Sequence, residues 1–270
     1  MTSSSPRACR TSIFQGADSR RAAPQRSGGS RLRWALTTAA VLAVPQIGSF
    51  TIVFFYTEGE TSNLKPLAVM AFCSNALMAW NWVSSPGYVT SSEELQTAEV
   101  NNRWCSVCRL WQPLRSKHCN ICERCVRKYD HHCFCIGGCV GESNHLRFFL
   151  LLTGCLPYVG SLLVALLRCL HVEDPTNLGR SFNRNIIPLA AAVFYLFSLI
   201  VLVCLWAMHL WLLLTNRTTW EMSSRNRITY LKSRTGNPFD KGVLSNICFL
   251  FQPKPINWCL LLKEDGEHLV

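Results

Sequence analysis

Four long apolar stretches constrain the fold of this 270-residue chain more than any other feature. They cover residues 34–56, 66–83, 148–170 and 186–214, and polar segments separate them. A helix needs about 20 apolar residues to cross the hydrocarbon core of a bilayer, and three stretches reach that length. The second is shorter and contains two Asn residues, so a buried helix of a soluble core is its alternative interpretation. We predict an all-α polytopic membrane protein with four transmembrane helices.

Basic residues are distributed unevenly among the polar segments. The first 33 residues contain seven Arg, and residues 103–147 and 215–270 contain eight basic residues each. The other two connections hold only Lys65 in one, and Arg180 and Arg184 in the other. Because positive residues stay on the cytosolic side of a membrane, both termini and the central polar segment are predicted to be cytosolic. The net charge of +11 is then mostly a topology signal, with anionic lipid or an anionic cosubstrate as secondary interpretations, and it requires no nucleic acid.

These boundaries divide the chain into five parts. The first apolar stretch starts too late and is too long for a cleaved signal peptide, so it is interpreted as a membrane span. The predicted parts are a disordered basic segment (1–33), helices one and two (34–83), a small cytosolic Cys-rich domain (84–147), helices three and four (148–214) and a cytosolic C-terminal region (215–270).

The central polar segment concentrates eight of the fifteen cysteines between Cys105 and Cys139. Thiols in the cytosol stay reduced, so clustered cysteines there are metal ligands or nucleophiles more often than disulfides. Pairs separated by two residues, such as Cys105 with Cys108, are typical of zinc-knuckle hairpins. Two tetrahedral zinc sites need eight ligands, whereas the segment offers eight Cys and three His. Three groups are therefore surplus, and spacing alone does not identify them.

The same segment contains the components of an activated nucleophile. Asp130, His131 and Cys133 lie within four consecutive residues. A thiol needs a base to become a nucleophile at neutral pH, and a carboxylate can orient that base. The segment therefore combines groups for metal binding with groups for covalent catalysis.

This pattern resembles the Cys-rich domain of the DHHC family of protein S-acyltransferases, or palmitoyltransferases. The resemblance covers roughly residues 34–252. Beyond Asp130-His131-His132-Cys133, it rests on three motifs: Val140-Gly141-x2-Asn144-His145-x2-Phe148, Thr218-Thr219-Trp220-Glu221, and Asn237-Pro238-Phe239-Asp240-x-Gly242 followed by Asn246.

The resemblance implies two interleaved structural zinc ions. One would be bound by Cys105, Cys108, His118 and Cys125, and the other by Cys119, Cys122, His132 and Cys139. Four protein ligands leave no open position on either ion, so we expect the zinc to order the domain rather than to take part in the chemistry.

The resemblance also implies the reaction. Cys133 would take a long-chain acyl group from acyl-CoA, typically palmitoyl-CoA, and pass it to a cysteine of a membrane-associated protein. His131 would act as the base and Asp130 would hold its ring. Thr218, Thr219, Glu221 and Asn246 would support the site. Residues alone predict only a helix cap at Thr218-x2-Glu221.

The acyl-CoA would use both the membrane and the basic cytosolic surface. Candidate residues for the acyl chain are Tyr158, Gly160, Phe194 and Phe197, although ordinary helix packing explains them equally well. Candidates for the CoA phosphates are Arg127, Lys128, Arg225, Arg227 and Lys232, for which solvated charge is the alternative. The expected partners are protein substrates, the bilayer and acyl-CoA, without nucleic acid. The expected location is the Golgi or endoplasmic reticulum membrane, with the plasma membrane as an alternative.

The chain departs from the family directly after the catalytic cysteine. Phe134 and Cys135 replace the usual Pro-Trp, and Gly138 replaces an Asn before the last zinc ligand. Asp130, His131 and Cys133 are intact, so an active enzyme is still expected. The alternatives are a membrane adaptor with a zinc-ordered loop, a ubiquitin-ligase-like cross-brace finger, and, least favoured, a zinc-dependent nucleic-acid binder.

Overall fold

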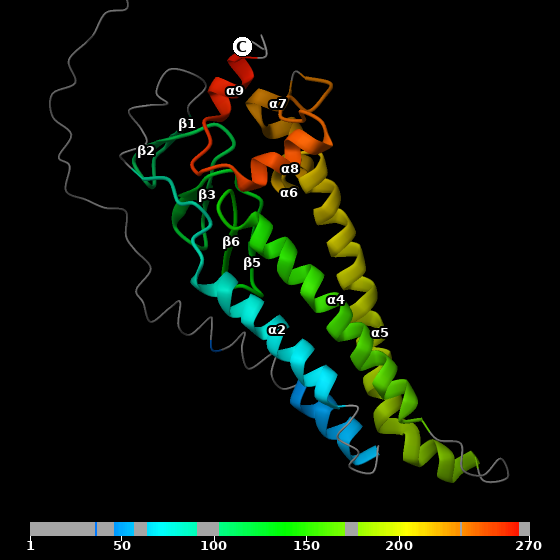
Figure 1. The fold of residues 1–270 in the computed structure, drawn as a ribbon. Helices are drawn as coiled ribbons and strands as arrows, with labels where there is room; N and C mark the ends of the chain where they lie inside the picture. Colours follow the sequence, from blue (N-terminus) through cyan, green and yellow to red (C-terminus); the bar gives the residue numbers. More distant parts are fainter. Residues whose placement is uncertain are drawn as a thin grey trace, which may run out of the picture.

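The computed structural model of the protein describes residues 36, 46–56, 64–90, 103–170, 178–232 and 234–264. Three long helices lie side by side in it (Figure 1). They are α2 (Leu64–Val83), α4 (His145–Arg168) and α5 (Leu178–Leu214). A shorter apolar helix, Gln46–Tyr56, packs against the end of this bundle. Within the described residues, His145–Arg168 and Ser181–Leu214 are long and apolar enough to cross a membrane.

The prediction of four spans is therefore supported for two helices. The third and fourth apolar stretches form α4 and α5, each starting several residues earlier than predicted. The second stretch forms α2, which does not pass the same test of length and hydropathy. In the first stretch only Leu36 and residues 46–56 are described. The predicted disordered segment 1–33 lies outside the described residues.

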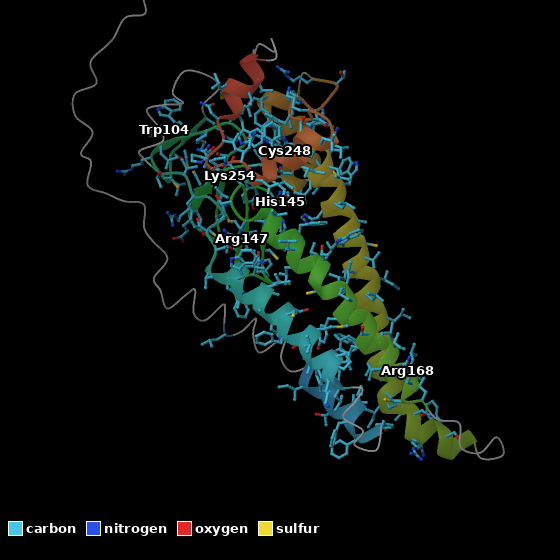
Figure 2. The ribbon with its side chains drawn as sticks, in the orientation of Figure 1. Trp104, His145, Arg147, Arg168, Cys248 and Lys254 are labelled. Atoms are coloured by element: carbon cyan, nitrogen blue, oxygen red, sulfur yellow. The ribbon has the colours of Figure 1, made fainter. Side chains whose placement is uncertain are left out.

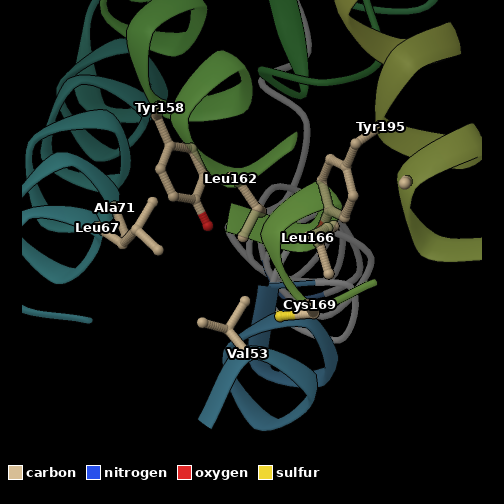
Figure 3. Close-up of a cluster of buried hydrophobic side chains, with 9 residues drawn as sticks. Val53, Leu67, Ala71, Tyr158, Leu162, Leu166, Cys169 and Tyr195 are labelled. Atoms are coloured by element: carbon tan, nitrogen blue, oxygen red, sulfur yellow. The ribbon is translucent and has the colours of Figure 1, made fainter. Parts of the chain in front are cut away.

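A glycine lies in the contact between α2 and α4. A Cβ added at Gly154 would lie 2.6 Å from Cδ1 of Leu77, so only Gly fits there without a shift. Ser74 donates a hydrogen bond to the Gly154 carbonyl across the same contact (3.2 Å). Small residues of this kind let membrane helices approach closely. Toward the far end of the bundle, Val53, Leu67, Tyr158 and Leu162 belong to a buried apolar cluster (Figure 3).

The prediction of an all-α class is wrong for the Cys-rich segment, which contains short strands. Three antiparallel hairpins are formed by β1 (Arg103–Cys105) with β2 (Leu110–Gln112), β3 (Lys117–Cys119) with β4 (Arg124–Val126), and β5 (His131–Cys133) with β6 (Gly138–Val140). Each strand has three residues. Such short strands show no hydrophobic alternation, so only the paired cysteines pointed to hairpins.

The C-terminal region packs onto these hairpins at one end of the helix bundle (Figure 1). It consists of α6 (Thr219–Ser223), η2 (Arg225–Arg227), α7 (Thr229–Lys232), α8 (Val243–Phe251) and α9 (Trp258–Glu264). Leu114 of the Cys-rich segment shares a buried cluster with Phe239, Trp258 and Leu262 of the C-terminal region. We call this end, formed by the three hairpins (residues 103–140) and the described residues of the C-terminal region (215–264), the head. His145 lies at the head and Arg168 at the opposite end of α4 (Figure 2).

A candidate catalytic and metal centre

The first group of metal-binding side chains comprises Cys105, Cys108, His118 and Cys125. Their donor atoms all lie within 4.8 Å of one another. Nδ1 of His118 is 3.2 Å from Sγ of Cys108, 3.6 Å from Sγ of Cys105 and 3.9 Å from Sγ of Cys125. Zinc bonds of about 2.3 Å to sulfur and 2.0 Å to nitrogen at tetrahedral angles place N and S about 3.5 Å apart. The group therefore fits one tetrahedral zinc ion.

The second group comprises Cys119, Cys122, His132 and Cys139, again within 4.8 Å of one another. Nδ1 of His132 lies 3.6, 3.3 and 3.6 Å from the sulfurs of Cys119, Cys122 and Cys139. The two groups alternate along the chain, because Cys119 and Cys122 lie between ligands of the first group. These are the two donor sets that the family resemblance implies.

The backbone after each cysteine pair explains how the sulfurs converge. In the first pair, Cys108 N–H donates to Sγ of Cys105 at 3.4 Å, and the next residue, Arg109, has φ of 53°. The pair Cys119–Cys122 repeats the same N–H to sulfur bond, and Glu123 has φ of 54°. A left-handed residue after a tight turn directs both sulfurs to one point.

Strand β5 directs the metal-binding side chain of His132 away from those of His131 and Cys133. Successive side chains of a strand point to opposite faces, so His131 and Cys133 leave one face and His132 leaves the other. His132 is paired with Cys139 across the β5–β6 hairpin, whereas Cys133 is paired with Gly138. His132 and Cys139 thus point to the second metal group, and Cys133 faces a position without a side chain.

The carboxylate of Asp130 is buried, with 1% of the residue exposed, and it accepts three hydrogen bonds. The Thr219 N–H donates to Oδ1, and the Thr219 hydroxyl and Nδ1 of His131 donate to Oδ2, at 2.8, 2.8 and 2.7 Å. Burial by itself would raise the pKa of Asp130, but the hydrogen bond from His131 and the nearby imidazoles lower it below its usual value. Asp130 is therefore ionised at neutral pH and fixes the His131 ring.

Helix α6 is held so that Thr219 can make these bonds. Thr218 caps the helix: its hydroxyl accepts from Glu221 N–H, and Glu221 Oε2 accepts from Thr218 N–H, both at 3.1 Å. The predicted capping box is therefore confirmed. Glu221 also receives two hydrogen bonds from Arg115, each 2.7 Å long. The start of α6 is thus fastened to the Cys-rich segment.

Arg115 is 1% exposed and was not identified from the sequence. Its guanidinium also donates to the side chain and the carbonyl of Asn216, and it stacks over Phe239 at 4.0 Å and Trp258 at 4.5 Å. No spacing rule distinguishes this Arg from the other basic residues around it. Only the contact between distant segments reveals it.

Two residues expected to pair with CoA phosphates are instead buried in the head. Arg127 pairs with Glu142 at 3.0 Å and donates to the carbonyl of Ile256 at 2.8 Å. Lys128 donates to Asn216 at 2.7 Å, and burial together with the charge of Arg115 lowers the pKa of Lys128 to about 7. The phosphate role is therefore wrong for these two residues, because both side chains are buried and hydrogen-bonded inside the head.

Asn246, a predicted supporting residue, anchors the C-terminal region to the end of α5. Its amide nitrogen donates to the Leu214 carbonyl and to the Asp240 carboxylate, each at 2.7 Å. Its amide oxygen accepts from Lys241 N–H at 3.0 Å. Asn246 therefore acts through the backbone of α5 and lies outside the Asp130 hydrogen-bond network.

Cys133 lies where the hairpins meet the membrane helices. It is half-buried and packs against an apolar cluster that includes Met78 of α2 and Phe148 of α4. A hydrogen bond with Cys135 and burial raise the pKa of the Cys133 thiol. The same hydrogen bond lowers the pKa of the exposed Cys135 to about 6, against the opposing effect of burial. Two thiols are therefore present at this boundary.

The candidate residues for the acyl chain do not share one environment. Gly160 lines an apolar cavity of about 530 Å³ with Val53, Leu67, Met70 and Val164. Tyr158 is buried in the adjoining cluster. Phe194 and Phe197 are 52% and 67% exposed and face away from the bundle. Of the four candidates, only Gly160 and Tyr158 are placed near an apolar cavity.

His209 of α5 lies next to the predicted catalytic residues but was not predicted as a site residue, although its place in an apolar stretch could have identified it. It is the one residue among Asp, Glu, Lys, Arg and His in the apolar stretch 186–214, and such a residue in a membrane helix usually marks a functional position. It is 2% exposed, and its ring centre lies 5.7 Å from that of His131 and 5.0 Å from that of Phe148. Asp130, His131 and His209 form a third group of donor atoms within 4.8 Å of one another.

Known proteins are similar in sequence to this chain over most of its length. The family model of the DHHC palmitoyltransferases matches residues 98–226. The chain is 36% identical to human palmitoyltransferase ZDHHC12 and 34% identical to its mouse counterpart, in each case over 90% of this chain and 93% of the relative. A ZDHHC-type palmitoyltransferase of Dictyostelium discoideum is 39% identical over 63% of this chain, which spans 39% of that longer protein.

Proposed function

Because the chain belongs to the DHHC palmitoyltransferase family and is a protein S-palmitoyltransferase, we propose that Cys133 is its nucleophile. The observation that carries this proposal is the position of Cys133. Its thiol leaves the same face of β5 as His131, whose ring is held by a buried, ionised Asp130. It also contacts apolar residues of the membrane helices, where an acyl chain is most stable.

The reaction proceeds in two transfers at one sulfur. Nδ1 of His131 is bonded to Asp130, so Nε2 is free to take the Cys133 proton. The thiolate attacks the acyl-CoA carbonyl, the bond to the CoA sulfur breaks, and the departing thiolate takes the proton from His131. A substrate thiol then gives its proton to His131, attacks the acyl-enzyme and leaves as the thioester, which restores the Cys133 thiol. Asp130 stabilises the imidazolium in both transfers.

Two zinc ions would hold this arrangement in place. Cys105, Cys108, His118 and Cys125 would bind one, and Cys119, Cys122, His132 and Cys139 the other. Four protein ligands leave no position for substrate, so each zinc would supply folding energy and no catalytic step. Since His132 lies between His131 and Cys133 on β5, the second ion would set the orientation of the strand that carries the catalytic pair.

The supporting residues act through Asp130 and the head. Thr219 holds the carboxylate, Thr218 and Glu221 hold Thr219, and Asn246 ties the C-terminal region to α5. The acyl chain would extend from Cys133 along α4 toward the cavity beside Gly160. The CoA phosphates would remain at the basic cytosolic surface.

The membrane protein is oriented with its head in the cytosol. Basic residues of the Cys-rich segment and C-terminal region lie together at the head, which favours cytosolic termini and four spans that divide the chain as the sequence suggests. The substrates would be membrane-associated proteins with cysteines near the cytosolic face. The Golgi or endoplasmic reticulum is the expected compartment.

Acyl transfer to the purified full chain tests the nucleophile. The enzyme is incubated with palmitoyl-CoA alone, and peptide mass spectrometry locates any hydroxylamine-sensitive adduct. Cys133→Ser should lose the adduct and retain two zinc ions per chain. Cys135→Ser is the matched control, since it removes the neighbouring, more acidic thiol, and it should remain acylated at Cys133.

The alternatives give different results in the same experiment. An adduct that persists in Cys133→Ser and disappears in Cys135→Ser would assign the nucleophile to Cys135. A chain that forms no thioester on either residue, although it binds both zinc ions, would favour a membrane adaptor.

A further inference from the structure

Three imidazole nitrogens near Asp130 have no hydrogen-bond partner within the described part of the chain. They are both ring nitrogens of His145 and Nδ1 of His209, and each is buried. Nε2 of His145 lies 4.0 Å from Oδ1 of Asp130. Buried polar groups are nearly always paired with protein, water or an ion. The unpaired Nδ1 of His209, a buried residue that belongs to the same donor group as Asp130, therefore indicates a ligand site.

The donor atoms at this position suit a transition metal. Asp130, His131 and His209 each offer one oxygen or nitrogen, and the three atoms lie within 4.8 Å of one another. One carboxylate and two imidazoles are borderline ligands that favour zinc over magnesium or calcium, which prefer oxygen. The His131 side chain is 29% exposed and provides a route for the ion from solvent.

We propose that Asp130, His131 and His209 form a third zinc site, distinct from the two structural groups, and that zinc bound there inhibits acyl transfer. The inhibitory part of this inference rests on the proposed role of His131 as the base. Three protein ligands leave a fourth position for water. His145 lies beside the site, with its ring centre 5.8 Å from that of His209.

Zinc would disable the base through either ring nitrogen. If the ion binds Nδ1 of His131, it replaces the proton shared with Asp130, and the neutral ring then carries its proton on Nε2. If the ion binds Nε2, it occupies the basic lone pair directly. In both cases the neutral ring keeps one proton, no redox change occurs, and His131 has no lone pair for the Cys133 proton. Thr219 keeps its hydrogen bonds to Asp130.

Zinc titration of the purified full chain tests the site with a direct binding readout. Protein carrying its two structural zinc ions is dialysed against increasing micromolar ZnCl2, and the zinc content per chain is measured by elemental mass spectrometry. The rate of Cys133 acylation by palmitoyl-CoA is measured in parallel. We expect one further zinc per chain and a matching loss of rate, with no loss in MgCl2.

His209→Asn and His209→Phe should weaken this zinc binding and inhibition together. Loss of a ligand should cost at least as much as loss of an outer partner, about 10–100-fold in zinc affinity. Cys204→Ser, which removes an exposed thiol from the same helix, is the matched control and should change neither. Thermal unfolding of each variant verifies that the fold is retained.

Cys133→Ser separates this inference from the proposed nucleophile. It forms no acyl-enzyme, but it should still bind the further zinc, because the proposed ligands are unchanged. The third site is excluded if wild-type protein binds no zinc beyond two ions, which would leave a bridging water as the occupant. It is also excluded if Cys133→Ser abolishes the further binding, or if the His209 variants retain it fully.

Discussion

Among single residues, the Asp130 carboxylate joins the hairpins to the C-terminal region. It accepts hydrogen bonds from His131 on β5 and from Thr219 on α6, 89 residues away. Its orientation therefore depends on two elements that are distant in the chain. A change in Thr219 should alter catalysis without touching a thiol or a metal ligand.

Thr219→Val should slow acylation of Cys133. The variant keeps the size of the side chain but loses the 2.8 Å hydrogen bond from the hydroxyl to Asp130. Hydrogen bonds to charged groups contribute about 1.5–3 kcal/mol, so the rate should fall by about tenfold to 100-fold. Thr219→Ser retains the hydroxyl and should remain close to wild type in single-turnover acylation. Equal rates for Val and Ser would contradict a role for this bond.

Lys128 should make the stability of the protein depend on pH. Its pKa is lowered from 10.5 to about 7 in the folded protein. Between these values the unfolded chain binds the proton and the folded chain does not. Stability should therefore rise from about pH 7 to pH 10.5, by up to about 1.4 kcal/mol per pH unit.

Thermal unfolding of Lys128→Met measures this dependence against a matched background. The variant retains every other titrating group, so the difference between its midpoint and that of wild type isolates Lys128. The wild-type midpoint should rise relative to that of Lys128→Met from pH 7 to pH 9. Parallel curves would show that Lys128 stays charged in the folded protein.

At the scale of elements, α6 depends on a residue of the Cys-rich segment. Glu221 completes the helix cap and also binds the buried Arg115 in a bidentate ion pair. The capping box could be predicted from Thr218-x2-Glu221, because it is a local pattern. The ion pair could not, because its partners are 106 residues apart.

Arg115→Met should destabilise the head strongly. The substitution leaves the Glu221 carboxylate buried without its charged partner, which costs about 3–5 kcal/mol. Adding Glu221→Gln removes the unpaired charge while keeping an acceptor for the Thr218 N–H, so the double variant should unfold at a higher temperature than Arg115→Met alone. If the two changes lower the thermal midpoint additively, the pair is not coupled.

Strand β5 is a second element whose side-chain directions could not be predicted from the local sequence alone. The order Asp-His-His-Cys identifies the residues but does not say which His binds metal, and the assignment came from the family resemblance. In the structure, alternation along the strand sends His132 toward Cys139 and leaves His131 beside Asp130. Gly138, which replaces the Asn of the family, is paired with Cys133 across the hairpin and therefore lies opposite the proposed nucleophile.

Across the whole molecule, the long helices separate the head from the end of α4 at Arg168. His145 and Arg168 mark opposite ends of α4 (Figure 2). The 24 residues of this helix extend about 36 Å, enough to cross a bilayer core of about 30 Å. The head and the α4–α5 connection should therefore lie on opposite sides of the membrane.

Glycosylation in cells tests this orientation. An Asn-Ser-Thr acceptor inserted between residues 171 and 177 should be modified, as shown by a gel shift that endoglycosidase reverses. The same acceptor placed at the C-terminus should remain unmodified. The native Asn216-Arg217-Thr218 acceptor should also remain unmodified, because Asn216 is 1% exposed within the head. Modification at the C-terminus alone would reverse the proposed orientation.

Features that depend on local order could be predicted from the sequence. Apolar stretches predicted α4 and α5, cysteine spacing indicated metal-binding hairpins, and a four-residue motif indicated a capped helix. The family followed from motifs in a conserved order along the chain. Each of these signals lies within a few tens of residues, where spacing fixes geometry.

Contacts between distant side chains follow from the packing of the folded chain alone. The antiparallel packing of α5 against α4 places His209 beside His131, and the packing of the C-terminal region buries Arg115, Arg127 and Lys128. The sequence does not distinguish a basic residue whose side chain faces water from one whose side chain pairs with a buried carboxylate. The role of such a residue depends on partners that the fold brings from far along the chain, which local patterns do not encode.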